Sequence, residues 1–275
     1  MKSRFEALAY GMLGSVAEAE EVVQEARLRL HQLPAPPASD EAFLYRVVSN
    51  LSIDRLRRAR TEREAYFGPW LPEPVQGDLS TQLELAQELT IGFVHLLEQL
   101  PPAERIVYVL RESFELSYDE LAAMLDITAQ TARQRVSRAR KRMRNRAAIQ
   151  AFPDDEGKRL LEKLVELVAE GDMQGLVSMM DEDVIAYTDG GGVVSAAVRP
   201  VHGAERIATV ILHLATKAAE EGPLDMTLER LNGTWALVIK QGGAIHSIHF
   251  ITGAGGKVHR VFALRNPRKM AHLEV

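Results

Sequence analysis

The sequence has 275 residues, of which 46% are hydrophobic and 26% charged, and its formal net charge is −5. Because single domains peak near ~100–150 residues, two or three domains are expected, each with its own core. The chain contains no cysteine, which excludes disulfides, thiolate metal sites and cysteine nucleophiles. It also shows no apolar run of the kind that marks a signal peptide or a membrane span, so we expect a cytoplasmic protein.

The net charge of −5 conceals an uneven distribution of charged residues along the chain. Residues 1–150 carry a net charge of −1 and residues 151–275 carry −4. Two clusters within the first half are strongly basic: Arg55, Arg57, Arg58, Arg60 and Arg63; and Arg133, Arg135, Arg138, Arg140, Lys141, Arg142, Arg144 and Arg146. Basic stripes on a nearly neutral domain are typical of phosphate contacts, although a solvated helix face is the alternative for either cluster alone.

The first half of the chain shows helical periodicity throughout. Helices are expected over 4–31 with a break near Gly14-Ser15, over 40–65 and over 81–99, from Pro101-Pro102 to about Phe114, over 117–125, and from Thr128 to about Gln150. Ser15 and Ser39 are suitable N-caps, and Glu18 completes a capping box with Ser15. A segment rich in proline and glycine, 66–80, separates the second helix from the third and reads as a linker. Pro153 and the acidic residues 154–156 are expected to end this half.

From residue 158 the hydrophobic period changes. Helices are expected over 158–171, 173–180 and 203–221, and strands over 183–188, 192–199, 224–231, 234–240, 244–251 and 257–264. Asn232-Gly233 predicts a tight hairpin turn, and 253–256 a second turn. Helices followed by an antiparallel meander predict an α+β domain.

The stretch 118–136 has the spacing of a helix-turn-helix. Leu121, Leu125 and Ile127 fall where two crossed helices bury side chains, and a narrow apolar stripe on the long helix continues at Ala132, Val136, Ala139 and Met143. That spacing leaves six residues projecting at the start of the second helix, where a recognition helix meets base edges: Thr128, Ala129, Gln130, Arg133, Gln134 and Ser137. A purely structural helical hairpin is the alternative. Asp126 stands where such turns usually have glycine, and aspartate tolerates a left-handed backbone better than most residues.

Three ordered motifs resemble a known family. The segments 100–112, 116–122 and 133–140 resemble region 4 of bacterial sigma factors, most closely the extracytoplasmic-function (ECF) group; 17–25 resembles region 2.2, and 43–58 resembles regions 2.3 to 2.4. The resemblance implies that region 2.2 docks on the clamp helices of core RNA polymerase and that regions 2.3–2.4 capture the −10 promoter element. The resemblance therefore implies two partners, core RNA polymerase and promoter DNA.

The resemblance also assigns roles to single residues. The implied polymerase-binding face comprises Glu18, Glu20, Glu21, Gln24 and Glu25. The implied DNA-binding residues are Asn50, Asp54, Arg55, Arg57 and Arg58 for the −10 element, Arg133, Gln134 and Ser137 for the −35 element with Thr128 and Gln130 beside them, and Arg138, Arg140 and Lys141 for phosphates. Asp54 has an alternative role, an ion pair with Arg58 one helical turn on.

Further motifs resemble an ECF subgroup with a fused SnoaL-like domain of NTF2-like fold. They are the linker run Trp70, Leu71, Pro72, Glu73 and Pro74; the loop Asp189, Gly190, Gly191 and Gly192; and the late run Asn266, Pro267, Arg268, Lys269 and Met270. Arg268 and Met270 depart from the subgroup's usual Asn-Pro-Asp-Lys-Leu, and the first helix is shorter than in most relatives. The resemblance implies that the loop and the late run meet the linker.

The sequence thus predicts a multidomain protein: two all-α sigma regions and an α+β NTF2-like domain. The expected boundaries are 1–65 for a shortened region 2, 66–80 for the linker, 81–150 for region 4 and 158–275 for the C-terminal domain. The expected function is a sigma factor whose C-terminal domain regulates it in place of a separate anti-sigma factor, by inhibition or by activation. No metal or other cofactor is expected, and a small ligand of the C-terminal domain stays open.

Two other functions are considered. One is a helix-turn-helix regulator that acts without polymerase and senses a ligand, but such a protein has no use for a clamp-binding helix. The other is a SnoaL-type isomerase or cyclase with a DNA-binding appendage, for which Asp189, His202, Arg206 and His249 are the candidate acids and bases. A histidine on an alternating strand is more often packed or exposed than catalytic, so we expect no enzyme.

Overall fold

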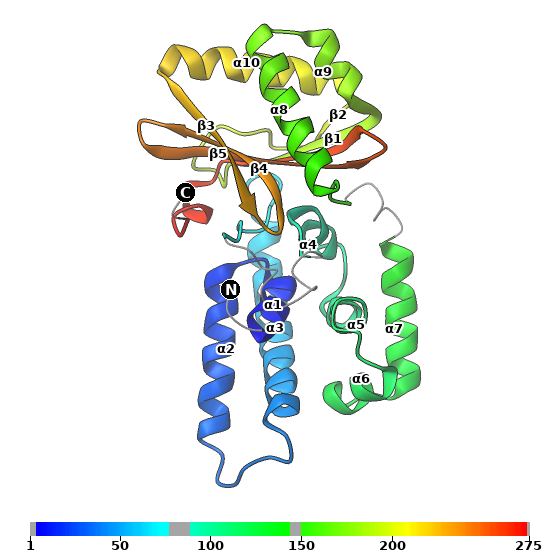
Figure 1. The fold of residues 1–275 in the computed structure, drawn as a ribbon. Coiled ribbons are helices and arrows are strands. Elements are labelled where there is room, and N and C mark those ends of the chain that lie inside the picture. Colours follow the sequence, from blue (N-terminus) through cyan, green and yellow to red (C-terminus); the bar gives the residue numbers. More distant parts are fainter. Residues whose placement is uncertain (1–3, 77–88, 144–149, 274–275) are drawn as a thin grey trace. The chain divides into compact units, whose positions relative to one another are not determined.

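The structure, a computed structural model, describes residues 4–76, 89–143 and 150–273. These residues form two compact units (Figure 1). The first comprises residues 4–65, 89 and 94–143, and the second comprises 66–76, 90–93 and 150–273. The linker 66–76 therefore belongs to the same unit as the C-terminal domain.

The first unit is helical. Its helices are α1 (Arg4–Leu13), α2 (Val16–His31), α3 (Asp40–Glu64), most of α4 (Ile91–Leu97), α5 (Pro102–Glu112), α6 (Tyr118–Leu125) and α7 (Ala129–Arg142). The helices α1, α2 and α3 pack together, and α5 packs against α1 and α3 as well as α7. Regions 2 and 4 of the predicted organisation are thus in contact within this unit.

Local sequence signals explain where these helices begin. The hydroxyl of Ser15 accepts from the Glu18 amide at 3.4 Å, and that of Ser39 from the Ala42 amide at 3.2 Å. Ser117 forms a complete capping box with Glu120, since each side chain bonds the other's backbone amide. Asp126 ends α6 with φ of 52°, the left-handed conformation expected in the helix-turn-helix. The caps predicted at Ser15 and Ser39 are confirmed.

The second unit is α+β. Its elements are α8 (Asp154–Glu170), α9 (Met173–Met179), β1 (Met180–Asp189), β2 (Val201–His202), α10 (Ala204–Glu221), β3 (Leu224–Leu231), β4 (Thr234–Gln241), β5 (Ala244–Ala254) and β6 (Lys257–Leu264). The sheet order is β2-β1-β6-β5-β4-β3. Strands β3 to β6 form the expected antiparallel meander, whereas β1 pairs with β6 in parallel. Asn232 and Gly233 both have positive φ, as a two-residue hairpin of type I′ requires.

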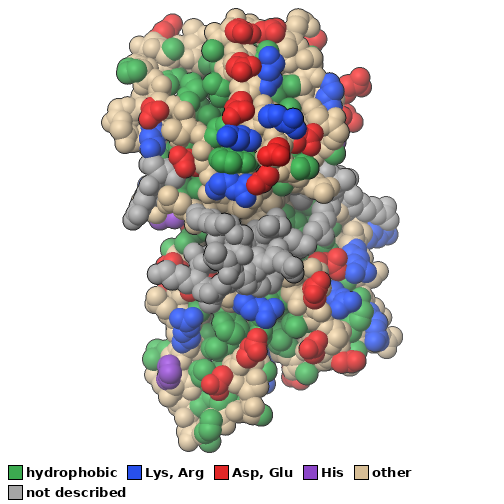
Figure 2. Space-filling view, viewed as in Figure 1, with side chains coloured by type: hydrophobic (Ala, Val, Ile, Leu, Met, Phe, Trp, Pro, Cys, Tyr) green, Lys and Arg blue, Asp and Glu red, His purple; other side chains and the backbone are tan. Residues whose placement is uncertain are grey.

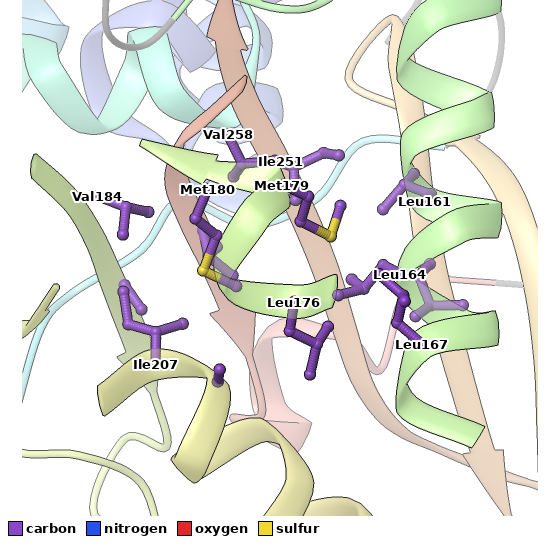
Figure 3. Packing of buried hydrophobic residues seen from close by; sticks show 14 of the residues in the cluster. Leu161, Leu164, Leu167, Leu176, Met179, Met180, Val184, Ile207, Ile251 and Val258 are labelled. Carbon is purple, nitrogen blue, oxygen red and sulfur yellow. The ribbon is translucent and has the colours of Figure 1, made fainter. Parts of the chain in front are cut away.

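The three helices of this unit cover one face of the sheet (Figure 1). Between helices and sheet lies an apolar core in which Leu161, Leu164 and Leu167 of α8 meet Leu176 of α9 and Ile207 of α10 (Figure 3). Because residues on a strand alternate between faces, Leu237 and Ile251 point to this core while their neighbours point to the opposite face. That opposite face carries buried side chains too, among them Phe250 and Phe262.

Two local predictions are wrong. No strand forms over 192–199, because Gly191 and Gly192 turn the backbone with positive φ and the amides of Val193 and Val194 bond the Gly190 carbonyl. The acidic residues 154–156 begin α8 rather than ending the helical half, since carboxylates stabilise the positive end of a helix. Residues 81–88 of the helix predicted over 81–99, and 144–149 of the last helix, lie outside the described residues.

Candidate functional site

The helix α7 presents the residues predicted to contact the −35 element. Ala132, Val136 and Ala139 are fully buried against the unit, so the opposite face of the helix points to solvent. The predicted contact residues are all exposed: Thr128, Gln130, Arg133, Gln134, Ser137, Arg138 and Lys141. Arg133, Gln134, Ser137 and Arg138 line an open hollow of about 540 Å³. Figure 2 shows blue basic side chains interleaved with red acidic ones on the side where α7 lies.

Acidic residues of α5 hold several arginines of α7. The carboxylate of Glu104 forms ion pairs with Arg138 at 3.2 Å and with Arg142 at 3.1 Å. Glu112 pairs with Arg140 at 2.8 Å, and this hydrogen bond raises the pKa of Arg140. The arginines are more than half exposed, so each pair contributes about 0–1 kcal/mol and can exchange its carboxylate for a phosphate.

Arg133 is held at the start of the same helix. Its guanidinium lies 5.2 Å from the ring centroid of Tyr118, and Arg111 lies over the same ring at 4.9 Å. Such cation–π contacts contribute about 0.5–1 kcal/mol at exposed sites. They reduce the freedom of the Arg133 side chain, which is one of the predicted −35 contacts.

The predicted −10 residues on α3 are also accessible. Asn50, Asp54, Arg57 and Arg58 are exposed, and Arg55 is partly buried. Asp54 pairs with Arg57 at 3.3 Å. The alternative role predicted for Asp54, an ion pair with Arg58, is therefore wrong in its partner.

The predicted polymerase-binding residues form an exposed acidic strip along α2. Glu20, Glu21, Gln24 and Glu25 are exposed, and Glu18 is partly buried. Glu21 pairs with Arg55 of α3 at 2.8 Å, which joins the acidic strip to the basic face of the neighbouring helix. The other carboxylates in the strip project from the side of α2 opposite its buried residues Val22, Val23 and Ala26.

Arg105 forms a buried ionic clasp between regions 2 and 4. Its Nε and Nη2 donate to the carbonyl of Gly11 at 3.1 and 2.9 Å, and its Nη1 bonds Glu98. Arg63 bonds the other oxygen of Glu98 and the carbonyl of Leu13. Burial alone would raise the pKa of Glu98, but the two arginines hold it below its usual value. No local sequence signal predicts this clasp, because nothing near a buried arginine in the sequence distinguishes it from an exposed one.

In the second unit the Asp189 carboxylate binds the linker through hydrogen bonds. It is fully buried and accepts from Lys269 Nζ at 2.8 Å, from the backbone amide of Leu71 at 2.8 Å and from the Tyr66 hydroxyl at 2.6 Å. Lys269 also bonds the Leu71 carbonyl and lies 4.0 Å from the ring centroid of Trp70. Burial and the bond to Asp189 together raise the pKa of Tyr66. We call this cluster, Tyr66, Trp70, Leu71, Asp189, Asn266 and Lys269, the linker clamp.

The remaining motif residues surround the clamp. The Asn266 amide donates to the Tyr66 hydroxyl at 2.9 Å and its backbone amide to the Asp189 carbonyl at 2.9 Å. A Cβ on Gly191 would lie 2.2 Å from the Asn266 Nδ2, so this position requires glycine. Pro72, Pro74 and Gly190 are buried, Glu73 is partly buried, and Gly192 and Pro267 are exposed. The structure thus brings the linker, the glycine loop and the late run together within the second unit.

Three contacts of the linker were not foreseen. Tyr66 precedes the linker motif, and the Val75 amide bonds the Asn232 side chain at 2.9 Å while His272 bonds the Pro74 carbonyl at 2.7 Å. Of these residues, the sequence singled out Asn232 alone, as part of a hairpin turn. Asn232 both forms that turn and accepts a hydrogen bond from the linker. The linker is therefore fastened at both ends of its motif.

The candidate acids and bases of an isomerase are not assembled. Strand register places Asp189 in line with Leu264 and Ile248, and His249 in line with Ala263 and Leu237, so the two side chains point to opposite faces of the sheet. His202 and Arg206 are exposed. Among the described residues, no group of three or more histidine or acidic side chains could hold a metal ion.

Comparison with known proteins decides the family. Residues 2–62 match the model for Sigma-70 region 2, and residues 92–143 match the model for Sigma-70, region 4. The ECF RNA polymerase sigma factor SigJ of Mycobacterium tuberculosis is 36% identical over 228 residues, which cover 78% of this chain and 73% of SigJ. This chain is an ECF sigma factor. A probable ECF sigma factor, SigI of the same species, is 32% identical over 268 residues, covering 89% of this chain and 88% of SigI.

The likeness to a solved structure extends to the C-terminal domain of this ECF sigma factor. The crystal structure of M. tuberculosis SigJ matches with a TM-score of 0.77 and 30% identity, covering 97% of this chain and 94% of that one. The predicted succession of helical sigma regions and a C-terminal α+β domain is confirmed. As members of this family do, the ECF sigma factor binds core RNA polymerase and promoter DNA and is a transcription factor rather than an enzyme. Among the described residues, no helix has the length and apolarity that crossing a membrane requires.

Proposed function

We propose that the C-terminal domain regulates this ECF sigma factor by holding the linker between regions 2 and 4, in place of a separate anti-sigma factor. The observation that supports this is the linker clamp. Around the buried Asp189–Lys269 pair of the C-terminal domain, three hydrogen bonds hold Tyr66 and Leu71 of the linker. A domain that binds the linker limits how far apart the two DNA-reading regions can lie.

The sigma regions supply the contacts that the family resemblance implies. In this proposal the acidic strip of α2 docks on polymerase, exposed residues of α3 bind the −10 element, and the start of α7 reads the −35 element. Each region alone binds weakly, and joining the two on one promoter raises the effective concentration of the second. Promoter recognition then depends on polymerase, in the cytoplasm, to set the spacing of the regions.

Run-off transcription with core polymerase tests the regulatory part. Deletion of residues 158–275 would cut α8, which begins at Asp154, and would remove the residues that bind the linker. The full-length variant Asp189→Asn avoids both problems, and Asp183→Asn is its matched control because Asp183 is an exposed aspartate on the same strand.

The sign of the result defines the regulation. More transcript from Asp189→Asn than from the wild type means that the clamped linker inhibits, and less transcript means that the clamp is needed for a productive complex with core polymerase. Equal transcript from Asp189→Asn, Asp183→Asn and the wild type would contradict the proposal, provided that the Leu71 amide is shown to be released.

A further inference from the structure

One carboxylate of α5 is shared by two arginines of α7. Arg138 Nε lies 3.2 Å from Glu104 Oε1, and Arg142 Nε lies 3.1 Å from Glu104 Oε2. The two arginines are four residues apart on α7, so they project from the same side of the helix. The Glu104 side chain is 10% exposed, whereas those of Arg138 and Arg142 are 61% and 53% exposed. The carboxylate thus lies beneath two arginines that still face solvent.

The geometry of these contacts indicates how Glu104 acts on the arginines. Its Oε2 is buried and accepts no hydrogen bond in the described part of the chain, although Arg142 is close to it. Glu112, by contrast, accepts two directed hydrogen bonds from Arg140, at 3.2 and 2.8 Å. An ion pair without a directed hydrogen bond offsets charge but fixes no orientation. Glu104 therefore offsets the charge of Arg142 rather than aiming its side chain.

The position of Glu104 in α5 favours its negative charge independently of the arginines. Glu104 lies in the first turn of the helix, where backbone amides without intrahelical partners favour a carboxylate. If DNA phosphates take up Arg138 and Arg142, this carboxylate loses its two cations and stays largely buried. It then also lies near the negative charge of the phosphates. Both effects oppose phosphate binding by the two arginines.

Arg138 belongs to the face of α7 that is predicted to meet DNA. It lines the open hollow of about 540 Å³ together with Arg133, Gln134 and Ser137. Arg133 and Gln134 have side chains suited to base edges, whereas Arg138 lies farther along the helix and is suited to phosphates. Glu104 therefore pairs with an arginine that is placed for the DNA backbone.

We propose that Glu104 restrains non-specific DNA binding by region 4, because it competes with DNA phosphates for Arg138 and Arg142. Phosphate contacts supply essentially all of the non-specific affinity of DNA-binding proteins, whereas base contacts carry the sequence information. A competing carboxylate therefore lowers binding to DNA that offers backbone contacts alone. This inference rests on the DNA-binding role proposed above for α7.

The test measures how the full-length factor, without polymerase, binds a fluorescently labelled duplex that lacks promoter elements. The variant Glu104→Gln keeps the shape of the side chain and removes its charge. We expect it to bind the duplex about three- to tenfold more tightly than the wild type at about 50 mM salt, because two ion pairs no longer compete with phosphates. The gain should shrink at about 200 mM salt, because salt screens the charges on which it depends.

Three controls separate this competition from other effects. Glu104→Asp keeps the charge, so it should bind within about twofold of the wild type if packing alone is altered little. Glu170→Gln removes an exposed negative charge at the end of α8 and should also bind within about twofold of the wild type. In the background Arg138→Ala/Arg142→Ala, adding Glu104→Gln should raise the affinity by less than about twofold, because the arginines that it frees are absent.

The outcomes distinguish this inference from the function on which it rests. Binding by Glu104→Gln that equals or falls below that of the wild type would overturn the proposal. An equal gain in Glu104→Asp, in Glu170→Gln or in the background without the two arginines would overturn it as well. Unchanged binding by Arg138→Ala/Arg142→Ala alone would contradict the DNA-binding role of this part of α7, and the inference with it.

Discussion

Replacing Asp189 with asparagine removes the charge at the centre of the linker clamp and keeps its shape. The Asp189 side chain is 0% exposed and that of Lys269 is 9% exposed, so solvent does little to screen their 2.8 Å ion pair. Breaking such a pair from one side typically costs about 3–5 kcal/mol, because the remaining charge stays buried. The asparagine amide group also faces donors, since both oxygens of Asp189 accept hydrogen bonds.

Hydrogen exchange at the Leu71 amide measures the release directly. This amide donates to the charged carboxylate at 2.8 Å, a bond that contributes about 1.5–3 kcal/mol. Its loss should speed local exchange by about ten- to a hundredfold, whereas the amide of Ser113, which bonds Val109 in the first unit, should be unaffected. Asp183→Asn serves as the control for a change of charge on β1.

The double variant Asp189→Asn/Lys269→Met completes a double-mutant cycle with the two single variants Asp189→Asn and Lys269→Met. With no charge left unpaired, it should be more stable than the sum of the single changes predicts, by about 0.5–3 kcal/mol. Leu71 exchange within twofold of the wild type in Asp189→Asn, or strictly additive losses in the cycle, would refute the reasoning that a buried ion pair holds the linker.

Three further predictions follow from buried charges and from α7. Burial lowers the pKa of His249 to about 4 in the folded protein, against 6.5 when unfolded, so the unfolded state binds more protons between these two pH values. The free energy of unfolding in urea should therefore fall by up to about 3 kcal/mol as the pH drops from 6.5 to 4. The variant His249→Gln should show a smaller fall. Arg105→Met, which breaks the clasp on Gly11 and Glu98, should lower the urea stability of the chain by about 3–5 kcal/mol, while the exposed Arg27→Met should change it by less than about 0.5 kcal/mol. Arg138→Ala should reduce the slope of log K against log salt for promoter binding by the polymerase complex by about 1, and an unchanged slope would mean that this arginine meets no phosphate.

Local chemistry accounts for the parts of the fold that the sequence predicted well. The helix starts at Ser15 and Ser39 follow from hydroxyl caps, and the hairpin at Asn232-Gly233 follows from residues that accept positive φ. The glycine loop and the linker motif were recognised by family resemblance. Their meeting around Asp189 was expected on that ground, but its chemistry, a carboxylate with an ammonium and three other donors, emerged only from the structure.

The missed features depend on partners far along the chain. Arg105 reaches Gly11, 94 residues away, and the identity of an arginine says nothing about whether a distant carbonyl will meet it. The bulge at His246 is a shift in strand register, which alternating hydrophobicity over 244–251 does not reveal. The valines of 192–199 looked like a strand because β-branched residues favour strands, but three glycines before them supply a turn that overrides this preference.

The linker clamp also has a consequence for the reach of the tether. Residues 66–76 run along the C-terminal domain, fastened at Tyr66, at Leu71 and at Val75, so their end-to-end length is set by that surface. Released and fully extended, these 11 residues can span at most about 36–40 Å. The bonds at Tyr66, Leu71 and Val75 thus hold a segment whose contour length is comparable to one turn of the DNA double helix, about 34–36 Å. In the regulation proposed above, the clamp would act as a length switch, because its release would change how far apart two recognition elements can lie while leaving the residues that read them unaltered.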